Sequence, residues 1–410
     1  MRNIKDYGAV GDGVALDTAA IQKAIDDGGI VYIPEGVYHT GTIYLKSNGG
    51  LHLAPGAILR ASHSREDYNA DDFCPQNAVF TSEWVTGAHL IVAVEQENVT
   101  IEGHGTIDGE GRHWMTEYNE STGAYRPNPA RPGQMIFFCE CRNVHVTDVN
   151  LSDSPYWHLF FHGCEDVFAR GLTIRGVRPR WTNDGIDIDC CKRVTVSGCV
   201  IDVGDDAIAV RAHKKPLLHS DGVCEQITIS NCVIRADQDY GMRIGVGAGT
   251  IKNVTVSNMD IEALHWGGIG IMGCWSSESK YATTIENILF SNINLRARRP
   301  IELYVCANGT NLPNPCHIDN IRFSNCFISA IEHSFLRGLP DERASNITMD
   351  GVTVRLDDKW KDGTNVFDIS CCDNVTMDGF KVTGDTQADT IKRVSCENSS
   401  SVEINGVQIN

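Results

Sequence analysis

A short pattern of polar and apolar residues recurs along most of the chain and limits the fold more than any other feature. Each copy begins with a polar residue and continues as a β-branched strand with alternating character, as in residues 143–148 (NVHVTD) and 253–258 (NVTVSN). From Asn143 to Ser401 the copies start 23 to 34 residues apart. Short strands at this interval, without helices of repeat length, are typical of a parallel β-helix. We therefore predict an all-β solenoid of this kind.

Other repeat architectures fit this pattern poorly. The chain lacks the LxxLxL pattern of leucine-rich repeats and the amphipathic helices of helical repeats. A propeller needs about four strands in every 40 to 50 residues, which is more than these units can supply. The longest intervals, of 33 and 34 residues, predict loops that protrude from the coils and build a cleft.

The first part of the chain departs from the repeat. Residues 1–97 are expected to form an N-terminal cap and the first coils, and residues 98–410 the regular coils of one domain, 1–410. A helix is predicted over residues 19–27, with Asp17 or Thr18 as its N-cap and Gly28-Gly29 after its end. Its apolar face would cover the open end of the coil stack, where unpaired strand edges invite other chains. Residues 109–132 are expected to form a long loop.

Charge and composition exclude several classes of function. The 53 acidic residues outnumber the 35 basic ones, giving a net charge of −18, which argues against nucleic acid as a partner. No run of about 18 apolar residues occurs, so no membrane association is expected. The first residues lack the apolar segment of a signal peptide, and we therefore predict a cytoplasmic protein.

The 16 cysteines are consistent with a cytoplasmic protein. A reducing compartment makes a disulfide framework unlikely to form, and the spacings typical of zinc sites are missing. We expect the thiols to be free and buried between coils, with Cys199, Cys232 and Cys326 at matching points of their repeats. We expect no metal and no cofactor.

Three carboxylates carry the strongest chemical signal. Asp184 and Asp205 are 21 residues apart, one repeat, and Asp206 follows directly. Single aspartates are common in turns, but three at matching places on neighbouring coils repel one another and favour a catalytic role. Paired carboxylates are what glycosidic bond hydrolysis needs. On a regular strand Asp205 and Asp206 would face opposite sides, so both can face the site only at a bend, which Gly204 supplies. We expect this cluster to be exposed.

Several motifs together resemble one family. They include residues 7–13 (YGAVGDG), 105–111 (GTIDGEG), 154–158 (SPYWH), 183–189 (NDGIDID) and 204–210 (GDDAIAV), and the pair Arg131-Pro132. The chain resembles the polygalacturonases, family 28 of the glycoside hydrolases, over nearly its whole length. The resemblance implies a right-handed parallel β-helix and an inverting mechanism.

The resemblance also implies roles for particular residues. Asp205 would be the general acid that protonates the leaving oxygen, and Asp184 and Asp206 would hold and deprotonate the attacking water. Asn183, Asp187 and His158 stand in or beside the same motifs and are predicted to bind substrate.

Two departures from the family pattern affect substrate recognition. Tyr240 takes the place of the histidine in the family's Gly-His-Gly motif, and residues 268–273 (GIGIMG) lack the Arg-x-Lys pair that grips a uronate carboxylate. Tyr240 could bind a sugar or simply pack. Predicted substitutes for the missing cations are Arg211, His213, Lys214 and Arg243, for which structural ion pairs are the alternative.

The leading prediction is a glycoside hydrolase that cleaves pectin-derived oligosaccharides, with exo action favoured by the longer loops. One alternative is a calcium-dependent polysaccharide lyase, in which the three aspartates bind calcium and Arg211 or Arg243 removes the proton at C5. Another is a noncatalytic carbohydrate-binding β-helix. The sequence leaves the sugar, the linkage and the oligomeric state open.

Overall fold

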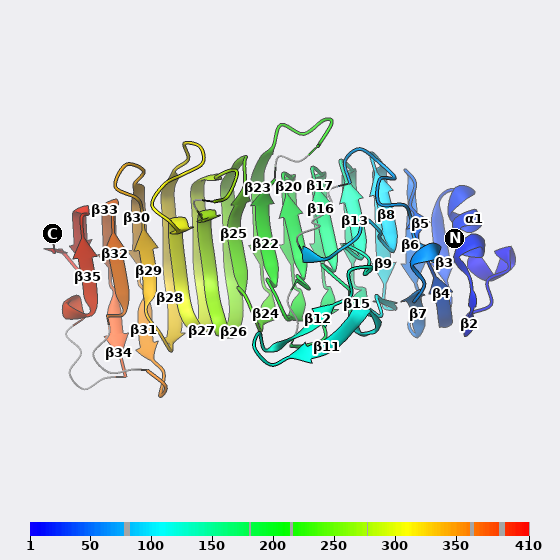
Figure 1. The fold of residues 1–410 in the computed structure, drawn as a ribbon, viewed down its shortest axis with the longest axis horizontal. Helices are drawn as coiled ribbons and strands as arrows, with labels where there is room; N and C mark the ends of the chain where they lie inside the picture. The colour runs from blue at the N-terminus through cyan, green and yellow to red at the C-terminus, as the bar shows by residue number, and fades with distance from the viewer. Residues whose placement is uncertain are drawn as a thin grey trace. The chain divides into compact units, whose positions relative to one another are not determined.

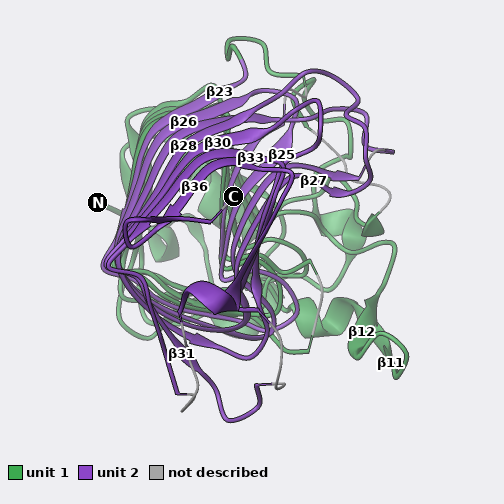
Figure 2. Ribbon diagram, turned by 90° about the vertical axis from the view of Figure 1, so that its left-hand side faces the viewer, with its two compact units in different colours: residues 1–207, 215–221 green, residues 208–214, 222–410 purple. Residues whose placement is uncertain are grey.

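The structure is a computed structural model that describes residues 1–77, 83–179, 182–213, 216–276, 278–360, 365–384 and 390–409. The chain divides into two compact units, residues 1–207 with 215–221 and residues 208–214 with 222–410, which Figure 2 shows in separate colours. The expected single domain stays a prediction. No helix among these described ranges is long and apolar enough to cross a membrane.

The described residues of the first unit form short strands and one α-helix (Figure 1). Its elements are β1 (Arg2–Asn3), β2 (Asp12–Leu16), α1 (Thr18–Asp26), β3 (Ile30–Ile33), β4 (Gly36–Thr40), β5 (Ile43–Tyr44), β6 (Gly49–Leu53), β7 (Ala57–Ala61), β8 (Ile91–Val94), β9 (Glu97–Gly103), β10 (Thr106–Asp108), β11 (Met115–Asn119), β12 (Ala124–Pro127), β13 (Ile136–Cys139), β14 (Arg142–Thr147), β15 (Asn150–Ser152), β16 (Leu159–His162), β17 (Glu165–Arg170), β18 (Thr173–Arg175), β19 (Ile186–Asp189), β20 (Lys192–Ser197) and β21 (Val200–Val203). Single 3₁₀ turns cover residues 4–7, 65–67 and 111–114.

The second unit contains strands and one 3₁₀ turn at residues 391–393. Its strands are β22 (Ile208–Ala212), β23 (Val223–Ser230), β24 (Val233–Ala236), β25 (Met242–Gly247), β26 (Thr250–Ser276), β27 (Thr284–Asn308), β28 (Ile318–Ala330), β29 (Ser334–Arg337), β30 (Ala344–Asp350), β31 (Thr353–Leu356), β32 (Phe367–Ser370), β33 (Cys372–Asp378), β34 (Lys381–Thr383), β35 (Val394–Glu397), β36 (Ser400–Ile404) and β37 (Val407–Gln408).

Strands one repeat apart pair in parallel and in register. In the first unit β13 pairs with β16 and β16 with β19, so that Ile136, Leu159 and Ile186 stack on the inner face. In the second unit β26 and β27 are long enough to run around the coil, and β27 continues the pairing to β28. This is the predicted right-handed parallel β-helix, in which each coil buries its apolar residues against the same residues of the next coil.

Helix α1 lies at the N-terminal end of the first unit, as predicted (Figure 1). It covers residues 18–26 and buries Ile21, Ala24 and Ile25. Asp17 is the N-cap residue, but its side chain makes no capping bond to the helix. The carboxylate instead accepts the backbone N–H groups of Val10 and Gly11, at 2.6 and 3.1 Å, and so holds the turn before β2.

The polar residue that opens each repeat has a conformational reason. The first residue of each copy adopts a left-handed backbone, with φ between 53° and 59°; these residues are Asn98, Asn143, Asp166, Arg193, Gln226, Asn253, Asn287, Asn320, Asn346, Asn374 and Ser401. Asparagine tolerates this region better than most residues because its side chain bonds locally. The amides also form ladders between coils, as in the Nδ2 to Oδ1 bond of 2.8 Å from Asn320 to Asn287.

We expect Asn320→Ala to lower the free energy of unfolding by about 1–2 kcal/mol, because it loses the amide bond and places a Cβ-bearing residue without polar atoms at φ 54°. Asn320→Gly loses the same bond but accepts the backbone, so it should be the more stable of the two. Urea unfolding measures both. The usual order, alanine more stable than glycine, would show that the left-handed backbone does not control this position.

The predicted long loop at residues 109–132 is wrong in part. Strands β11 and β12 form an antiparallel hairpin there, apart from the parallel coils. Tyr118 and Tyr125 face each other across it with ring centroids 5.3 Å apart, and Gly123 turns the chain with φ 68°. The alternation is too short and too polar to stand out from a loop in the sequence.

The cysteines lie as predicted where the structure defines them. All 16 are free, and all but Cys74 and Cys396 are buried. Cys199, Cys232 and Cys326 occupy equivalent places, since each thiol contacts the carbonyl oxygen two residues before it, at 3.2 to 3.6 Å.

Candidate active site

Backbone hydrogen bonds bring the predicted motifs together in the first unit. The N–H of His158 donates to the carbonyl oxygen of Asp184 at 2.9 Å, and the N–H of Gly185 donates to that of Asp206 at 2.9 Å. The segments just before β16, just before β19 and just after β21 are therefore stacked on successive coils. This confirms that Asp184 and the Asp205-Asp206 pair lie on neighbouring coils.

The three carboxylates are more enclosed than expected. Asp184 is 2%, Asp205 6% and Asp206 0% exposed, so the prediction of an exposed cluster is wrong. The sequence identifies the three aspartates, but it does not show which residues cover them in the fold. Asp205 retains the greatest access of the three.

Asp205 is held by backbone donors on two sides. Its Oδ2 accepts the N–H of Thr182, and its Oδ1 accepts the N–H of Asp206 at 3.0 Å. The chain bends at Gly204 and Asp205, between β21 and β22, as the glycine predicts. Such bonds fix the direction of the carboxyl group before any substrate arrives.

Asn183 and His158 support this arrangement from inside. The Oδ1 of Asn183 accepts the N–H of Gly204 at 2.8 Å, which ties the segment of Asp184 to that of Asp205. The Nε2 of His158 accepts the N–H of Ser154 at 3.3 Å, so its Nδ1 carries the proton and donates to the Asp184 carbonyl at 2.8 Å. Both side chains are fully buried, as is Asp206, and their predicted role in substrate binding stays a prediction.

Asp187 is also fully buried. It lies on β19 in register with Phe160, so both side chains stand on the outer face of the sheet. Phe160 belongs to an aromatic cluster on that face with Phe137, Tyr156 and Trp157.

Arg131 is a positioning residue whose role could not be read from its motif. The guanidinium is fully buried and donates to the carbonyl oxygens of Trp84, Pro155 and Glu83 at 2.7 to 2.9 Å. It also donates to the hydroxyl of Thr182 at 2.8 Å. Arg131 thereby fixes the residue whose N–H holds Asp205.

Thr182 itself has an unusual backbone. Its φ is 63°, a left-handed conformation that β-branched residues almost never adopt. Strain of this kind costs about 1–3 kcal/mol and clusters at functional sites, where the surrounding bonds enforce it. The sequence gives no signal for it, since nothing local predicts a left-handed threonine.

The remaining predicted binding residues belong to the second unit, except Lys214, which lies outside the described residues. Arg211 is buried on β22 and His213 is half-buried. The guanidinium of Arg243 pairs with Asp239 at 2.8 Å and lies over the ring of Tyr240, 5.5 Å from its centroid.

Tyr240 is covered by a cluster with Met272, Tyr304 and Phe335 and does not form an exposed platform. It is buried, and its hydroxyl donates to Glu302 at 2.7 Å. Glu302 also accepts the hydroxyl of Tyr304 at 3.0 Å and pairs with Arg299 at 3.1 Å. Burial, together with the charge of Glu302, raises the pKa of Tyr240, so the hydroxyl stays protonated and keeps donating. Sequence analysis did not identify Glu302 as the partner of Tyr240, because the two residues are 62 positions apart.

The ring of Tyr240 fills the space beside Gly267 and Gly270. A Cβ at Gly270 would lie 2.8 Å from this ring, and one at Gly267 would lie 2.1 Å from it. Any side chain at either position would collide with the tyrosine. The buried position of the Tyr240 ring therefore requires glycine at positions 267 and 270.

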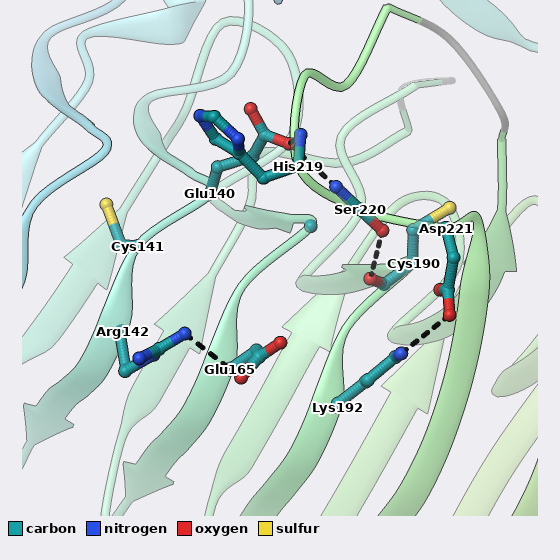
Figure 3. Close-up of a pocket in the computed structure, with 10 residues that line it drawn as sticks. Glu140, Cys141, Arg142, Glu165, Cys190, Lys192, His219, Ser220 and Asp221 are labelled. Atoms are coloured by element: carbon teal, nitrogen blue, oxygen red, sulfur yellow. Dashed lines mark hydrogen bonds and ion pairs between the residues drawn. The ribbon is translucent and has the colours of Figure 1, made fainter.

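A separate pocket of about 130 Å³ lies in the first unit beside residues 219–221 (Figure 3). The carboxylate of Glu140 accepts the N–H groups of Leu218, His219 and Ser220 and the amide of Gln76. Although partial burial acts to raise the pKa of Glu140, these donors hold it below its ordinary value of 4.5. Glu140 thus anchors this loop to β13.

We expect Glu140→Gln to speed amide hydrogen exchange at residues 218–220 about tenfold, because a neutral amide replaces a charged acceptor. The stabilisation by Glu140 is present above pH 4.5 and is lost as the pH falls through its lowered pKa, so the wild type should show the same change in acid. Glu165→Gln, in the same pocket, is the matched control. Unchanged exchange in Glu140→Gln would contradict this role.

Comparison with known proteins agrees with this fold. The family model described as "Glycosyl hydrolases family 28" matches residues 71–403. A "Probable polygalacturonase" of Vitis vinifera is 28% identical over 221 residues, which cover 51% of this chain and 44% of that protein. An "Endo-polygalacturonase" of Pectobacterium parmentieri is 26% identical over 364 residues, 84% of this chain and 85% of that one.

A solved structure matches the fold over nearly the whole chain. The family 28 exopolygalacturonase of Yersinia enterocolitica superposes with a TM-score of 0.75 at 19% identity, covering 99% of this chain and 78% of that one. These matches define the class of the protein, a glycosyl hydrolase with a right-handed parallel β-helix fold. The chain belongs to glycosyl hydrolases family 28. It spans less than half of the length of the plant relatives it matches first, 44% and 46%.

Proposed function

We propose that this protein hydrolyses glycosidic bonds of pectin-derived oligosaccharides that contain galacturonate. The observation that carries the proposal is the carboxylate cluster of the first unit, in which Asp205 is oriented by the N–H of a strained threonine. Three enclosed carboxylates on neighbouring coils are costly to the fold, and acid–base catalysis at a glycosidic bond is the chemistry that uses them. Relatives named as polygalacturonases support the substrate class.

The proposed mechanism assigns one role to each acid. Asp205 gives its proton to the leaving oxygen as the glycosidic bond breaks. Asp184 and Asp206 hold a water molecule on the opposite face of the sugar and take its proton as it attacks the anomeric carbon. Acid and base separated by about 6.5–9.5 Å leave room for this water, and the product then has the inverted anomeric configuration.

Exo action is part of the proposal and rests on the longer repeats. Matched proteins are named both endo- and exopolygalacturonase, so product size must decide. Location in the cytoplasm stays a prediction.

The test is digestion of de-esterified oligogalacturonides by the full chain, with and without a calcium chelator. Hydrolysis yields new reducing ends without absorbance near 232 nm and is insensitive to chelator. An unsaturated product that disappears with chelator would show a lyase instead, and binding without turnover would show a noncatalytic protein. Release of monomer from the start would establish exo action, and a ladder of intermediate sizes would establish endo action.

A further inference from the structure

A hollow of about 500 Å³ lies on the outer face of the second unit, away from its apolar interior. It extends over β26, β27, β28, β31 and β34, several of which Figure 2 labels. The strands are in register here, so Asn294, Phe327 and Thr353 form one row of side chains. Arg296, Ser329 and Arg355 form a second, parallel row. Neighbouring side chains in each row are about 4.8 Å apart.

An aromatic ring stands in this polar face. Phe327 is 60% exposed, although strand residues with rings are usually covered. Ser329 and Thr353 beside it are small, which leaves the ring's flank open. A large apolar group kept in water at the edge of a hollow indicates a contact surface for a ligand.

The two arginines of the hollow differ in their partners. Arg296 pairs with Glu262 at 3.5 Å and with Asp357 at 3.4 Å, so its charge is compensated. Arg355 is exposed and makes no hydrogen bond or ion pair with any residue in the described ranges. An uncompensated guanidinium is available to bind a carboxylate through two parallel bonds.

These features match one ligand chemistry. The apolar C–H face of a pyranose ring can stack on Phe327, its carboxylate can bind Arg355, and its hydroxyl groups can bond Ser329, Thr353 and Asn294. We propose that the hollow is a second binding site, separate from the carboxylate cluster, for oligosaccharides that contain uronic acids. The choice of uronic acid rests on the proposed function as well as on Arg355; the existence of the site rests on the residues of the hollow.

The test is calorimetric titration of full-length Asp205→Asn protein, whose turnover is strongly reduced under the proposed mechanism, with a galacturonate trimer. We expect two sites in this protein and one site after Phe327→Ala or Arg355→Gln is added. Tyr281→Ala and Arg322→Gln are the matched controls, an exposed ring and an exposed arginine outside the hollow, and should keep both sites. A neutral galactose trimer should not bind the hollow.

The outcomes separate this proposal from the proposed function. Binding that is unchanged by Phe327→Ala and Arg355→Gln overturns the second site, whatever the enzyme does. A neutral trimer bound as tightly as the galacturonate trimer overturns the ligand class. If the only site found is lost in the two hollow variants, the second site stands and the carboxylate cluster does not bind this sugar. Unchanged thermal melting of each variant shows that the side chain, and not the fold, causes the loss.

Discussion

Asp205→Asn is expected to lower kcat by about 10²- to 10⁴-fold on pectin oligosaccharides, the contribution typical of a general acid. An amide has the same shape as the carboxyl group but cannot give a proton to the leaving oxygen. Because Asp205 is enclosed and accepts two backbone N–H groups, the variant should also lose about 1–3 kcal/mol of stability. The effect on activity far exceeds what this loss of stability can explain.

Two comparisons make this result specific. A substrate whose leaving group needs no proton, such as a dinitrophenyl galacturonide, should restore most of the rate to the variant. Asp166→Asn removes a half-buried aspartate of the same unit that pairs with Arg193, and should leave kcat unchanged. If Asp205→Asn keeps most of its activity on the natural oligosaccharide, Asp205 is not the acid.

Arg131→Met is expected to have the second largest effect, a loss of about 3–5 kcal/mol of stability together with a fall in kcat. Methionine fills similar space but leaves three carbonyl oxygens and the Thr182 hydroxyl without their buried donor. The fall in kcat follows because Thr182 then no longer holds Asp205 in place. Urea unfolding and initial rates, measured well below the melting temperature, give the two quantities.

Further variants separate positioning from simple stability. Thr182→Ser keeps the hydroxyl that Arg131 binds and should retain nearly full activity. Thr182→Val keeps the branched shape without the hydroxyl and should resemble Arg131→Met in kcat. Arg126→Met, at an exposed arginine of the nearby hairpin, controls for loss of a positive charge. An Arg131→Met protein that is unstable but fully active when folded would show that Arg131 supports the fold alone.

The sequence predicted the features that repeat and missed those that depend on distant residues. The coils and the stacked cysteines follow from local patterns that recur in the repeats, and the bend at Gly204 follows from the glycine itself. The bond of Arg131 to Thr182 joins residues 51 positions apart, and the bond of Tyr240 to Glu302 joins residues 62 positions apart. No local pattern predicts these bonds or the enclosure of the aspartates. The left-handed asparagines are an intermediate case. The sequence shows that asparagine recurs at this position, but it does not show the backbone conformation.

The departures from the family pattern are another case in which the sequence does not show contacts between distant residues. The sequence shows that Tyr240 and residues 268–273 depart from the family pattern, and it gives no sign that they contact each other. The structure shows that the ring of Tyr240 fills the space that a side chain at position 270 would need. Packing thus couples Tyr240 to the glycine at position 270, and Arg243 lies beside the same ring as a cation of this region.

The most direct test of the central claim is a proton NMR time course of galacturonate oligosaccharide cleavage, recorded before the product anomers equilibrate. The proposed roles of Asp184, Asp205 and Asp206 predict new reducing ends of inverted configuration in the wild type and almost none in Asp205→Asn. Product with retained configuration, an unsaturated product, or no product from any galacturonate oligosaccharide would contradict the account.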